Sequence, residues 1–263
     1  MKRPVAIVTG GTSGIGRATA RALRAAGCQV YTVSRREADE ETGHLQADVT
    51  DEEAVRRAVE RVAELAGGVD ILVNCAGFGI SGAVEFTELS EAKRQFDVNF
   101  FGMVNTSKAV IPIMREAGHG RIVNISSVAA PVPIPFQTYY SASKAAINAY
   151  TLATANELRP FGITMCAIQP GDIATGFTDA RAKSAEGDDV YEGRISRSVE
   201  VMEKDERGGM DPAVAGRYIA KIAVKKSVKP LYVIGFAYKL VCVAVKLLPC
   251  RLANRIVGKI YAK

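Results

Sequence analysis

Short apolar runs alternate with longer amphipathic segments along most of this chain. The runs are rich in β-branched residues, as in buried strands, and the segments between them carry apolar residues at helical spacing. The predicted strands are 5–9, 29–34, 44–48, 69–74, 121–126, 164–169 and 231–234. The predicted helices are 14–26, 51–66 (capped by Thr50), 90–116, 139–158 and 211–224. This alternation predicts an α/β fold with a doubly wound parallel sheet and helices on both of its faces.

The chain is expected to form a single domain over residues 1–263, because its length and its 48% hydrophobic content suffice for one core. Two segments depart from the rhythm of strands and helices. Residues 176–210 are polar with weak periodicity, and a connection of this length is typical of a substrate lid loop. Residues 236–263 form a C-terminal extension beyond the last strand. Within the helical region 90–116, a kink is expected near Gly102.

Positive charge is concentrated at the end of the chain. The formal net charge is +6, but eleven Lys or Arg and no acidic residue follow Asp211, so residues 1–211 carry −5. Such an end suits a membrane surface or an acidic ligand. Nucleic-acid binding is disfavoured, because the charge is confined to an amphipathic tail without a reader motif. No apolar run is long enough for an ordinary transmembrane helix, and the run before Thr9 is too short for a secretory leader.

The cysteines and histidines predict no metal site and no disulfide. The five cysteines are an odd number without C-x-x-C spacing, and neither His44 nor His119 has a plausible ligand partner. This cysteine usage fits a reducing cytoplasm.

A glycine-rich turn, T-G-G-T-S-G-I-G at residues 9–16, joins the first predicted strand to the first helix. Gly10 permits the tight turn, Gly14 lets a pyrophosphate approach the backbone, and Gly16 allows the helix to pack closely on the strand. The helix N-terminus then favours the negative charge of the phosphates. The sequence therefore predicts a Rossmann-type dinucleotide site, although the spacing differs from G-x-G-x-x-G.

Arg35 and Arg36 follow the second strand, where a cofactor with a free ribose 2′-hydroxyl would require an acidic residue. A guanidinium grips a 2′-phosphate with paired hydrogen bonds. We therefore expect NADP(H) to be favoured over NAD(H), with Arg35 on the phosphate. Glu37 lies close by and is the feature that weighs against this preference.

Tyr140 and Lys144 lie four residues apart on a predicted helix, so their side chains share one face. A phenol has a pKa of roughly 10, and an adjacent ammonium is expected to lower it toward neutrality. The pair could then move protons in catalysis, although the same spacing also occurs on ordinary helix surfaces.

The chain resembles the short-chain dehydrogenase/reductase family over roughly residues 4–175. The motifs that carry the resemblance are T-G-x-x-x-G-I-G (9–16), Asp48-Val49, N-C-A-G (74–77), Asn99 in V-N-F-F-G, Ser127 in N-I-S-S, Y-S-A-S-K (140–144) and P-G-D-I-A-T (170–175). Cys75 stands where the family usually has Asn, a change that we expect to be structural.

The resemblance implies a catalytic group of four residues, Asn99, Ser127, Tyr140 and Lys144. Tyr140 exchanges a proton with the substrate oxygen, and Ser127, thirteen residues before it, polarises that oxygen. Lys144 holds the nicotinamide ribose, and Asn99 holds a water that links Lys144 to solvent. Ser126 and Tyr139 are expected to be structural neighbours.

The resemblance also implies the remaining cofactor contacts. Asp48 binds adenine, Asn74 supports the central strand and the cofactor, and Thr175 holds the nicotinamide carboxamide. The expected cofactor-binding residues are Gly10, Thr12, Ser13, Gly14, Ile15, Gly16, Arg35, Asp48, Val49, Asn74, Ala76, Gly77, Tyr140, Lys144, Pro170, Gly171, Ile173 and Thr175.

The C-terminal extension resembles that of the hydroxysteroid and retinol dehydrogenase branch. Its basic residues Arg251, Arg255 and Lys259 repeat every fourth position beside Leu252, Ile256 and Ile260, as in helices that lie on anionic membranes or pack on a partner. Residues 131–136 and the lid residues Phe177, Val190 and Tyr191 are expected to line an apolar pocket.

These features favour an NADP(H)-dependent oxidoreductase of a bulky apolar secondary alcohol or ketone, such as a steroid or another lipid-like compound. A 3-ketoacyl-thioester reductase and a general carbonyl reductase are alternatives within enzymes. An NADP(H)-binding sensor or scaffold is the alternative outside them, but it would not need the four catalytic residues. The family implies a homodimer or homotetramer formed through the helices that carry Asn99 and Tyr140.

Overall fold

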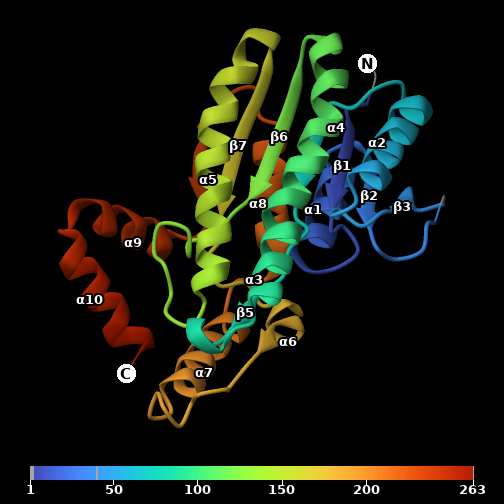
Figure 1. Cartoon of the computed structure of the whole chain (residues 1–263). Coiled ribbons are helices and arrows are strands. Elements are labelled where there is room, and N and C mark those ends of the chain that lie inside the picture. Colours follow the sequence, from blue (N-terminus) through green and yellow to red (C-terminus); the bar gives the residue numbers. More distant parts are fainter. Residues whose placement is uncertain (1–2, 40, 263) are drawn as a thin grey trace.

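A seven-stranded parallel sheet forms the centre of the molecule (Figure 1), in a computed structural model that describes residues 3–39 and 41–262. Its strand order is β3-β2-β1-β4-β6-β7-β9, so the order reverses between β1 and β4. In open sheets of this kind, ligands bind outside the carboxyl ends of the strands at that reversal. The strands are β1 (Val5–Thr9), β2 (Gln29–Ser34), β3 (His44–Gln46), β4 (Ile71–Asn74), β6 (Gly120–Ile125), β7 (Ile163–Gln169) and β9 (Leu231–Val233).

Helices cover both faces of the sheet, and each face has its own apolar core. On one face Leu23 of α1 and Ile219 of α8 are fully buried, and on the other Val59 of α2 and Met114 of α4 are. The helices of the first face are α1 (Gly14–Ala25) and α8 (Pro212–Ala223), and those of the second are α2 (Glu52–Ala66), α4 (Gly102–Ala117) and α5 (Thr138–Leu158). The predicted α/β fold with a doubly wound parallel sheet is confirmed.

The predicted helix 90–116 is two helices joined by a wide turn. α3 (Leu89–Phe96) passes through a π-helical turn, η2 (Asp97–Phe101), into α4. Gly102 follows this turn and packs against Val49, whose side chain a Cβ at this position would overlap. π-helical turns insert an extra residue and occur often at functional sites, and this one carries Asn99.

The cap of α2 is Asp51, where Thr50 was predicted. The Asp51 carboxylate accepts a hydrogen bond from the Ala54 amide, while the Thr50 hydroxyl donates to Asp48 Oδ1 at 2.8 Å. A carboxylate at this position also interacts favourably with the positive end of the helix dipole.

Residues 176–210 are more regular than the predicted loop. They contain α6 (Phe177–Ala180), β8 (Ala182–Lys183), which pairs with β5 (Ile80–Ser81), and the helix α7 (Arg194–Arg207). The buried residues of α7 are Ile195, Ser198 and Met202. Because so few apolar positions mark this helix, its periodicity is hidden in the sequence. Two single-turn 3₁₀ helices complete the elements, η1 (Val84–Phe86) and η3 (Arg159–Phe161).

The extension folds into two helices, α9 (Phe236–Leu247) and α10 (Cys250–Tyr261), which together we call the arm. The chain turns between them at Pro249, which cannot continue a helix because it lacks an amide proton. Figure 1 shows the arm projecting from the body. The arm and α7 both lie toward the carboxyl ends of the strands. Among the described residues, no helix combines the length and the hydropathy needed to cross a membrane.

Candidate active site

A cavity of about 720 Å³ opens at the carboxyl ends of four neighbouring strands. Its walls include the glycine turn after β1, residues 75–78 after β4, residues 125–129 at the end of β6 and residues 170–173 after β7. Helices α5 and α7 and the arm complete it. The sheet therefore brings the predicted motifs, which are far apart in the sequence, to one place.

The glycine turn fits the phosphates of a dinucleotide. Gly10 and Gly14 have φ of 64° and 48°, a region that residues with a Cβ rarely adopt, and a Cβ on Gly16 would overlap the carbonyl oxygen of Gly10. Ser13 precedes α1 without capping it, and no acidic residue lies in the first turn of this helix. The first amides of α1 are therefore available to an anion.

Asn74 lies behind the cavity wall, and its side chain holds the scaffold together. Its amide donates to Asn124 at 2.9 Å and to Ser107 at 3.3 Å, and it accepts from the Thr106 hydroxyl at 2.6 Å. These bonds tie β4 to β6 and to α4. Cys75, Ala76 and Gly77, by contrast, lie in the cavity wall.

The residues expected at the adenosine end lie outside the main cavity. Asp48 uses one carboxylate oxygen to hold Thr50, which leaves the other for a ligand. A smaller cavity of about 270 Å³ beside β2 is lined by Thr12 and Arg36 among others, whereas Arg35 is exposed next to it. His44, which sequence reasoning left without a role, is buried beneath this cavity and bonds Thr32 and Ser34.

Tyr140, Ser127 and Lys144 meet in the middle of the main cavity. Tyr140 hydrogen-bonds Ser127, while Ser126 donates its hydroxyl to the backbone oxygen of Lys144 at 3.0 Å and is fully engaged in the scaffold. The Ser127 side chain therefore faces Tyr140 while Ser126 faces the scaffold, and the catalytic role of Ser127 stays a prediction. Lys144 Nζ donates to the carbonyl oxygen of Ile125 at 2.9 Å and lies 5.6 Å from the centre of the Tyr140 ring.

Burial dominates the ionisation of this pair. It raises the pKa of Tyr140 to about 12, against a lowering by the hydrogen bond with Ser127, and it lowers the pKa of Lys144 to about 8. The expected lowering of the Tyr140 pKa by Lys144 is not found, because the ammonium is directed at Ile125 instead of the phenol oxygen. Tyr140 is consequently protonated at neutral pH, as a proton donor must be.

Asn99 lies in the π-helical turn and binds the backbone of Phe78 twice. Its side chain accepts from the Phe78 amide at 2.9 Å and donates to the Phe78 oxygen at 3.0 Å. A Cβ on Gly77 would lie 3.0 Å from Asn99 Oδ1 and 3.7 Å from Lys144 Nζ, so these groups are close neighbours. The water relay through Asn99 stays a prediction.

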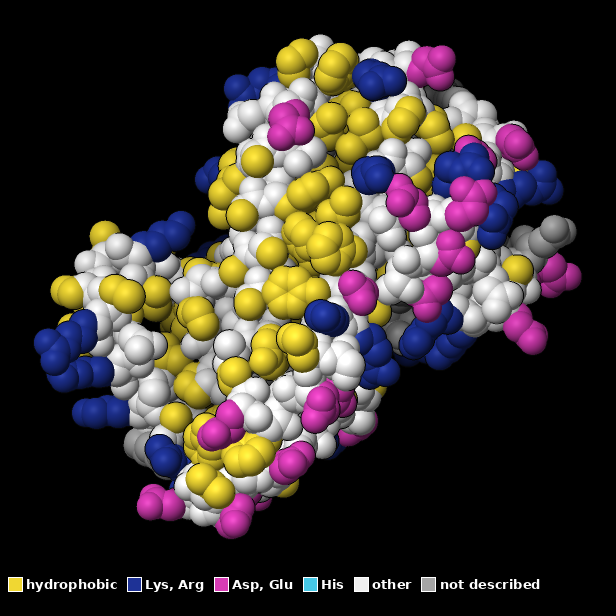
Figure 2. Space-filling model, viewed as in Figure 1, with side chains coloured by type: hydrophobic (Ala, Val, Ile, Leu, Met, Phe, Trp, Pro, Cys, Tyr) yellow, Lys and Arg dark blue, Asp and Glu magenta, His cyan; other side chains and the backbone are white. Residues whose placement is uncertain are grey.

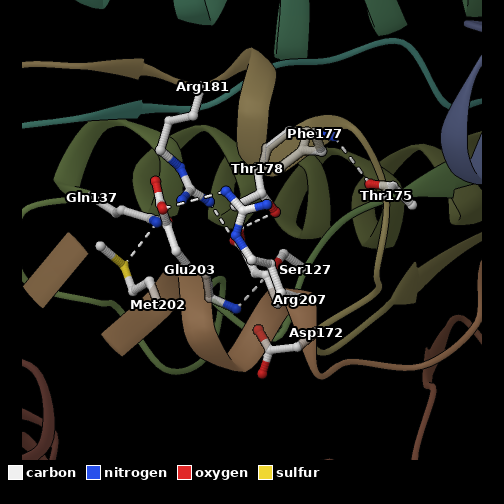
Figure 3. Close-up of polar contacts among 12 residues, drawn as sticks. Ser127, Gln137, Asp172, Thr175, Phe177, Thr178, Arg181, Met202, Glu203 and Arg207 are labelled. Atoms are coloured by element: carbon white, nitrogen blue, oxygen red, sulfur yellow. Dashed lines mark hydrogen bonds and ion pairs between the residues drawn. The ribbon is translucent and has the colours of Figure 1, made fainter. Parts of the chain in front are cut away.

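Two carboxylates in the cavity wall were missed by sequence reasoning. Glu206 of α7 pairs with Arg181 and accepts a hydrogen bond from the Thr178 hydroxyl at 2.7 Å; Thr178, Arg181 and Asp172 are labelled in Figure 3. Asp172 accepts the hydroxyl of Tyr238 in α9, and burial raises its pKa. Asp172 stands within the motif at 170–175, but no pattern marked Glu206.

The rest of the cavity wall is largely apolar. Val132 and Ile134 from the segment before α5 contribute to it, as does Phe177, whose ring lies 5.8 Å from that of Tyr140. Val190 and Tyr191 were expected there but do not reach it: Val190 is exposed, and Tyr191 bonds Glu85 on the outside. The arm supplies the apolar wall that sequence reasoning did not foresee, through Val241, Val245, Leu248, Ile256, Val257 and Ile260.

Comparison with known proteins decides the family. The family model described as short chain dehydrogenase matches residues 4–186. The chain belongs to the short-chain dehydrogenase/reductase family. It is 42% identical, over 86% of each chain, to a 3-ketodihydrosphingosine reductase of Bacteroides thetaiotaomicron. It is 31% identical to dehydrogenase/reductase SDR family member 7B of Xenopus laevis, over 89% of this chain and 75% of that one.

Solved structures match the fold over most of its length. A short-chain dehydrogenase from Streptomyces avermitilis superposes with a TM-score of 0.84 at 30% identity and covers 99% of this chain and 97% of its own. An aldohexose dehydrogenase of Thermoplasma acidophilum superposes with a TM-score of 0.76 at 26% identity over 91% of this chain and 95% of its own. The same fold therefore serves sugars, and the substrate must be argued from the cavity.

As a short-chain dehydrogenase/reductase, this protein is an NAD(P)-dependent oxidoreductase of CH–OH groups. The nicotinamide supplies or accepts a hydride when it is bound. The glycine turn, Ser127 and Tyr140 line one cavity. Binding of the phosphates by the turn, contact of the Ser127 and Tyr140 hydroxyls with the substrate oxygen, and donation of the Tyr140 proton during reduction stay predictions.

Proposed function

We propose that this protein is an NADP(H)-dependent reductase of a long-chain amino ketone similar to 3-ketodihydrosphingosine. The observation that carries the proposal is the combination, in one cavity, of an apolar wall from the arm with two carboxylates near Tyr140. The apolar wall suits an alkyl chain. The carboxylates suit a cationic amine, which a neutral steroid lacks.

Asp172 is the carboxylate better placed to accept an ammonium. Glu206 is already paired with Arg181, whereas Asp172 makes no ion pair with any described residue and bonds only the Tyr238 hydroxyl through its side chain. A carboxylate that burial destabilises gains most from a cation brought by the substrate. The phosphates of the cofactor would be repelled there, so Asp172 and Glu206 belong to the substrate end of the cavity.

The preference for NADP(H) is part of the proposal. Its support is the basic pair after β2, where Arg35 is exposed and Arg36 lines the small cavity together with Thr12. Glu37 also lines this cavity and is the group that a 2′-phosphate would have to avoid.

We also propose that the protein assembles through α4 and α5 and touches a membrane through the arm. Figure 2 shows apolar side chains gathered over the outer faces of α4 and α5, where Phe101, just before α4, and Leu152 of α5 are exposed. A lipid-like substrate would reside in a membrane, so contact between the arm and the membrane would bring the cavity close to its substrate.

The test measures NADPH oxidation with four ketones: 3-ketodihydrosphingosine, a ketone of the same chain length without the amine, a steroid ketone and an acetoacetyl thioester. We expect the amino ketone to give the highest kcat/KM. In Tyr140→Phe, turnover should fall at least ~10²-fold while NADPH binding stays near normal, because only the proton donor is lost. Turnover within twofold of wild type would remove Tyr140 from the mechanism, and a preference for the steroid or the thioester would overturn the substrate.

A further inference from the structure

The two helices of the arm differ in where their apolar side chains point. In α10, Ile256 and Ile260 of the stripe that the sequence suggested for a membrane belong to the wall of the open cavity, and only Leu252 of that stripe lies outside it. The most exposed apolar surface of the arm lies on α9. Its stripe, which we call the outer face, is exposed to 78% at Phe236, 56% at Leu240, 54% at Val243 and 79% at Leu247.

Helical geometry places these four residues together. Their spacings of four, three and four positions keep them within about 60° of arc on α9, at 100° per residue. Tyr238, Val241 and Val245 of the same helix point into the cavity, on the opposite side. α9 is thus apolar on two faces, and one of them has no partner within the described residues.

Charge identifies the surface that would cover the outer face. The arm contains five basic residues and no acidic one, and Lys239 and Lys246 lie on α9 at one border of the outer face. Figure 2 shows the basic side chains along the edge of the arm. A second copy of the arm would bring the same positive charge and be repelled, whereas an anionic bilayer attracts it.

We propose that the outer face of α9 docks on an anionic lipid bilayer. Phe236, Leu240, Val243 and Leu247 enter the boundary between headgroups and acyl chains, and Lys239 and Lys246 contact the lipid phosphates. This orientation holds the cavity, which is lined by the opposite face of α9, directly above the membrane. This docking rests on the membrane contact proposed above and gives it a surface, but it does not depend on which ketone the enzyme reduces.

Vesicle co-sedimentation of the full chain tests this proposal without cofactor or substrate. Wild type should bind vesicles of equal phosphatidylcholine and phosphatidylglycerol, and more weakly those of phosphatidylcholine alone. Phe236→Ser with Leu247→Ser should bind both at least about tenfold more weakly, because two large side chains no longer leave water. Lys239→Glu with Lys246→Glu should lose the preference for anionic vesicles.

Leu65→Ser with Leu89→Ser is the matched control, since these residues are 53% and 62% exposed on the body. It should bind vesicles as wild type does, and NADPH binding should be the same in all variants, because none of these side chains lines the cavity. Failure of wild type to bind anionic vesicles would overturn the proposal. Unchanged vesicle binding by Phe236→Ser with Leu247→Ser would also overturn it. If this variant at the same time lost self-association in sedimentation velocity, the outer face would be an interface with a second copy of the chain.

The two proposals fail separately. Lack of activity on every long-chain ketone would remove the proposed function and leave vesicle binding intact. If the protein reduced dispersed amino ketone normally but did not bind vesicles, the docking proposal would fail and the proposed substrate would stand.

Discussion

Lys144 is buried as a cation, with its ammonium on the backbone oxygen of Ile125. Burial disfavours the charged form and lowers the pKa of this residue from 10.5 to about 8. A folded-state pKa below the unfolded value means that the unfolded chain binds the proton more tightly. The charge therefore destabilises the fold fully below pH 8, and this effect is lost as the pH rises through 8 toward 10.5.

This linkage gives a prediction for Lys144→Met, which keeps much of the side-chain volume and removes the charge. The variant should have a higher Tm than wild type at pH 6, by a few degrees, and the difference should shrink by pH 9.5 as wild-type Lys144 becomes neutral. Thermal unfolding at several pH values measures it. A difference that stays constant across this range would show that Lys144 is not titrating near pH 8.

Arg35 carries the second prediction at this scale. Arg35→Ala should weaken NADPH binding about tenfold more than NADH binding, because a charge-assisted bond to the 2′-phosphate is lost. Arg36→Ala is the neighbouring control, with a smaller selective loss expected. Fluorescence titration with both cofactors measures the ratio of the two dissociation constants. Equal losses of NADPH and NADH affinity in Arg35→Ala would contradict binding of the 2′-phosphate by Arg35. A larger selective loss in Arg36→Ala would assign the 2′-phosphate to Arg36.

At the scale of elements, the sequence predicts best where burial is continuous. β1 (Val5–Thr9) begins and ends at the predicted residues, because a parallel strand that is covered on both faces has a nearly continuous apolar sequence. α7 was missed for the opposite reason, since it is a polar helix anchored at only a few positions. The division of 90–116 into α3 and α4 depends on a π-helical turn that no composition rule marks.

The candidate site divides in the same way. Motifs fixed by backbone requirements, such as the turn around Gly10 and Gly14, could be placed from the sequence together with Tyr140 and Lys144. Asp172 and Glu206 could not be placed in the cavity wall from the sequence, because their positions depend on tertiary contacts with Tyr238 and with Arg181. The direction of the Tyr140 pKa shift could not be predicted from the sequence either, because burial of the side chain decides it.

At the scale of the whole molecule, the arm is joined to the body close to the reactive centre. The Tyr238 hydroxyl donates to Asp172, and the Tyr238 ring packs on Gly171, where a Cβ would overlap it. In α9 only Cys242 is buried, and in α10 only Ala253 and Val257. With so little buried surface, the arm is expected to open more readily than the core.

Tyr238→Phe tests how the arm is held. The variant keeps the ring on Gly171 and loses the hydrogen bond to a carboxylate, so opening of the arm should increase about tenfold. Trypsin should then cleave faster after Lys239 and Lys246, because cleavage follows the population of the open form, and KM for a long-chain ketone should rise while that for a short one stays constant. Tyr232→Phe is the matched control, since the Tyr232 hydroxyl of β9 accepts its hydrogen bond from the Lys229 amide, outside the arm. If both variants are cleaved at the wild-type rate, the bond from Tyr238 to Asp172 does not hold the arm, and the wall of the cavity must be fixed by the contacts of α10 with α7.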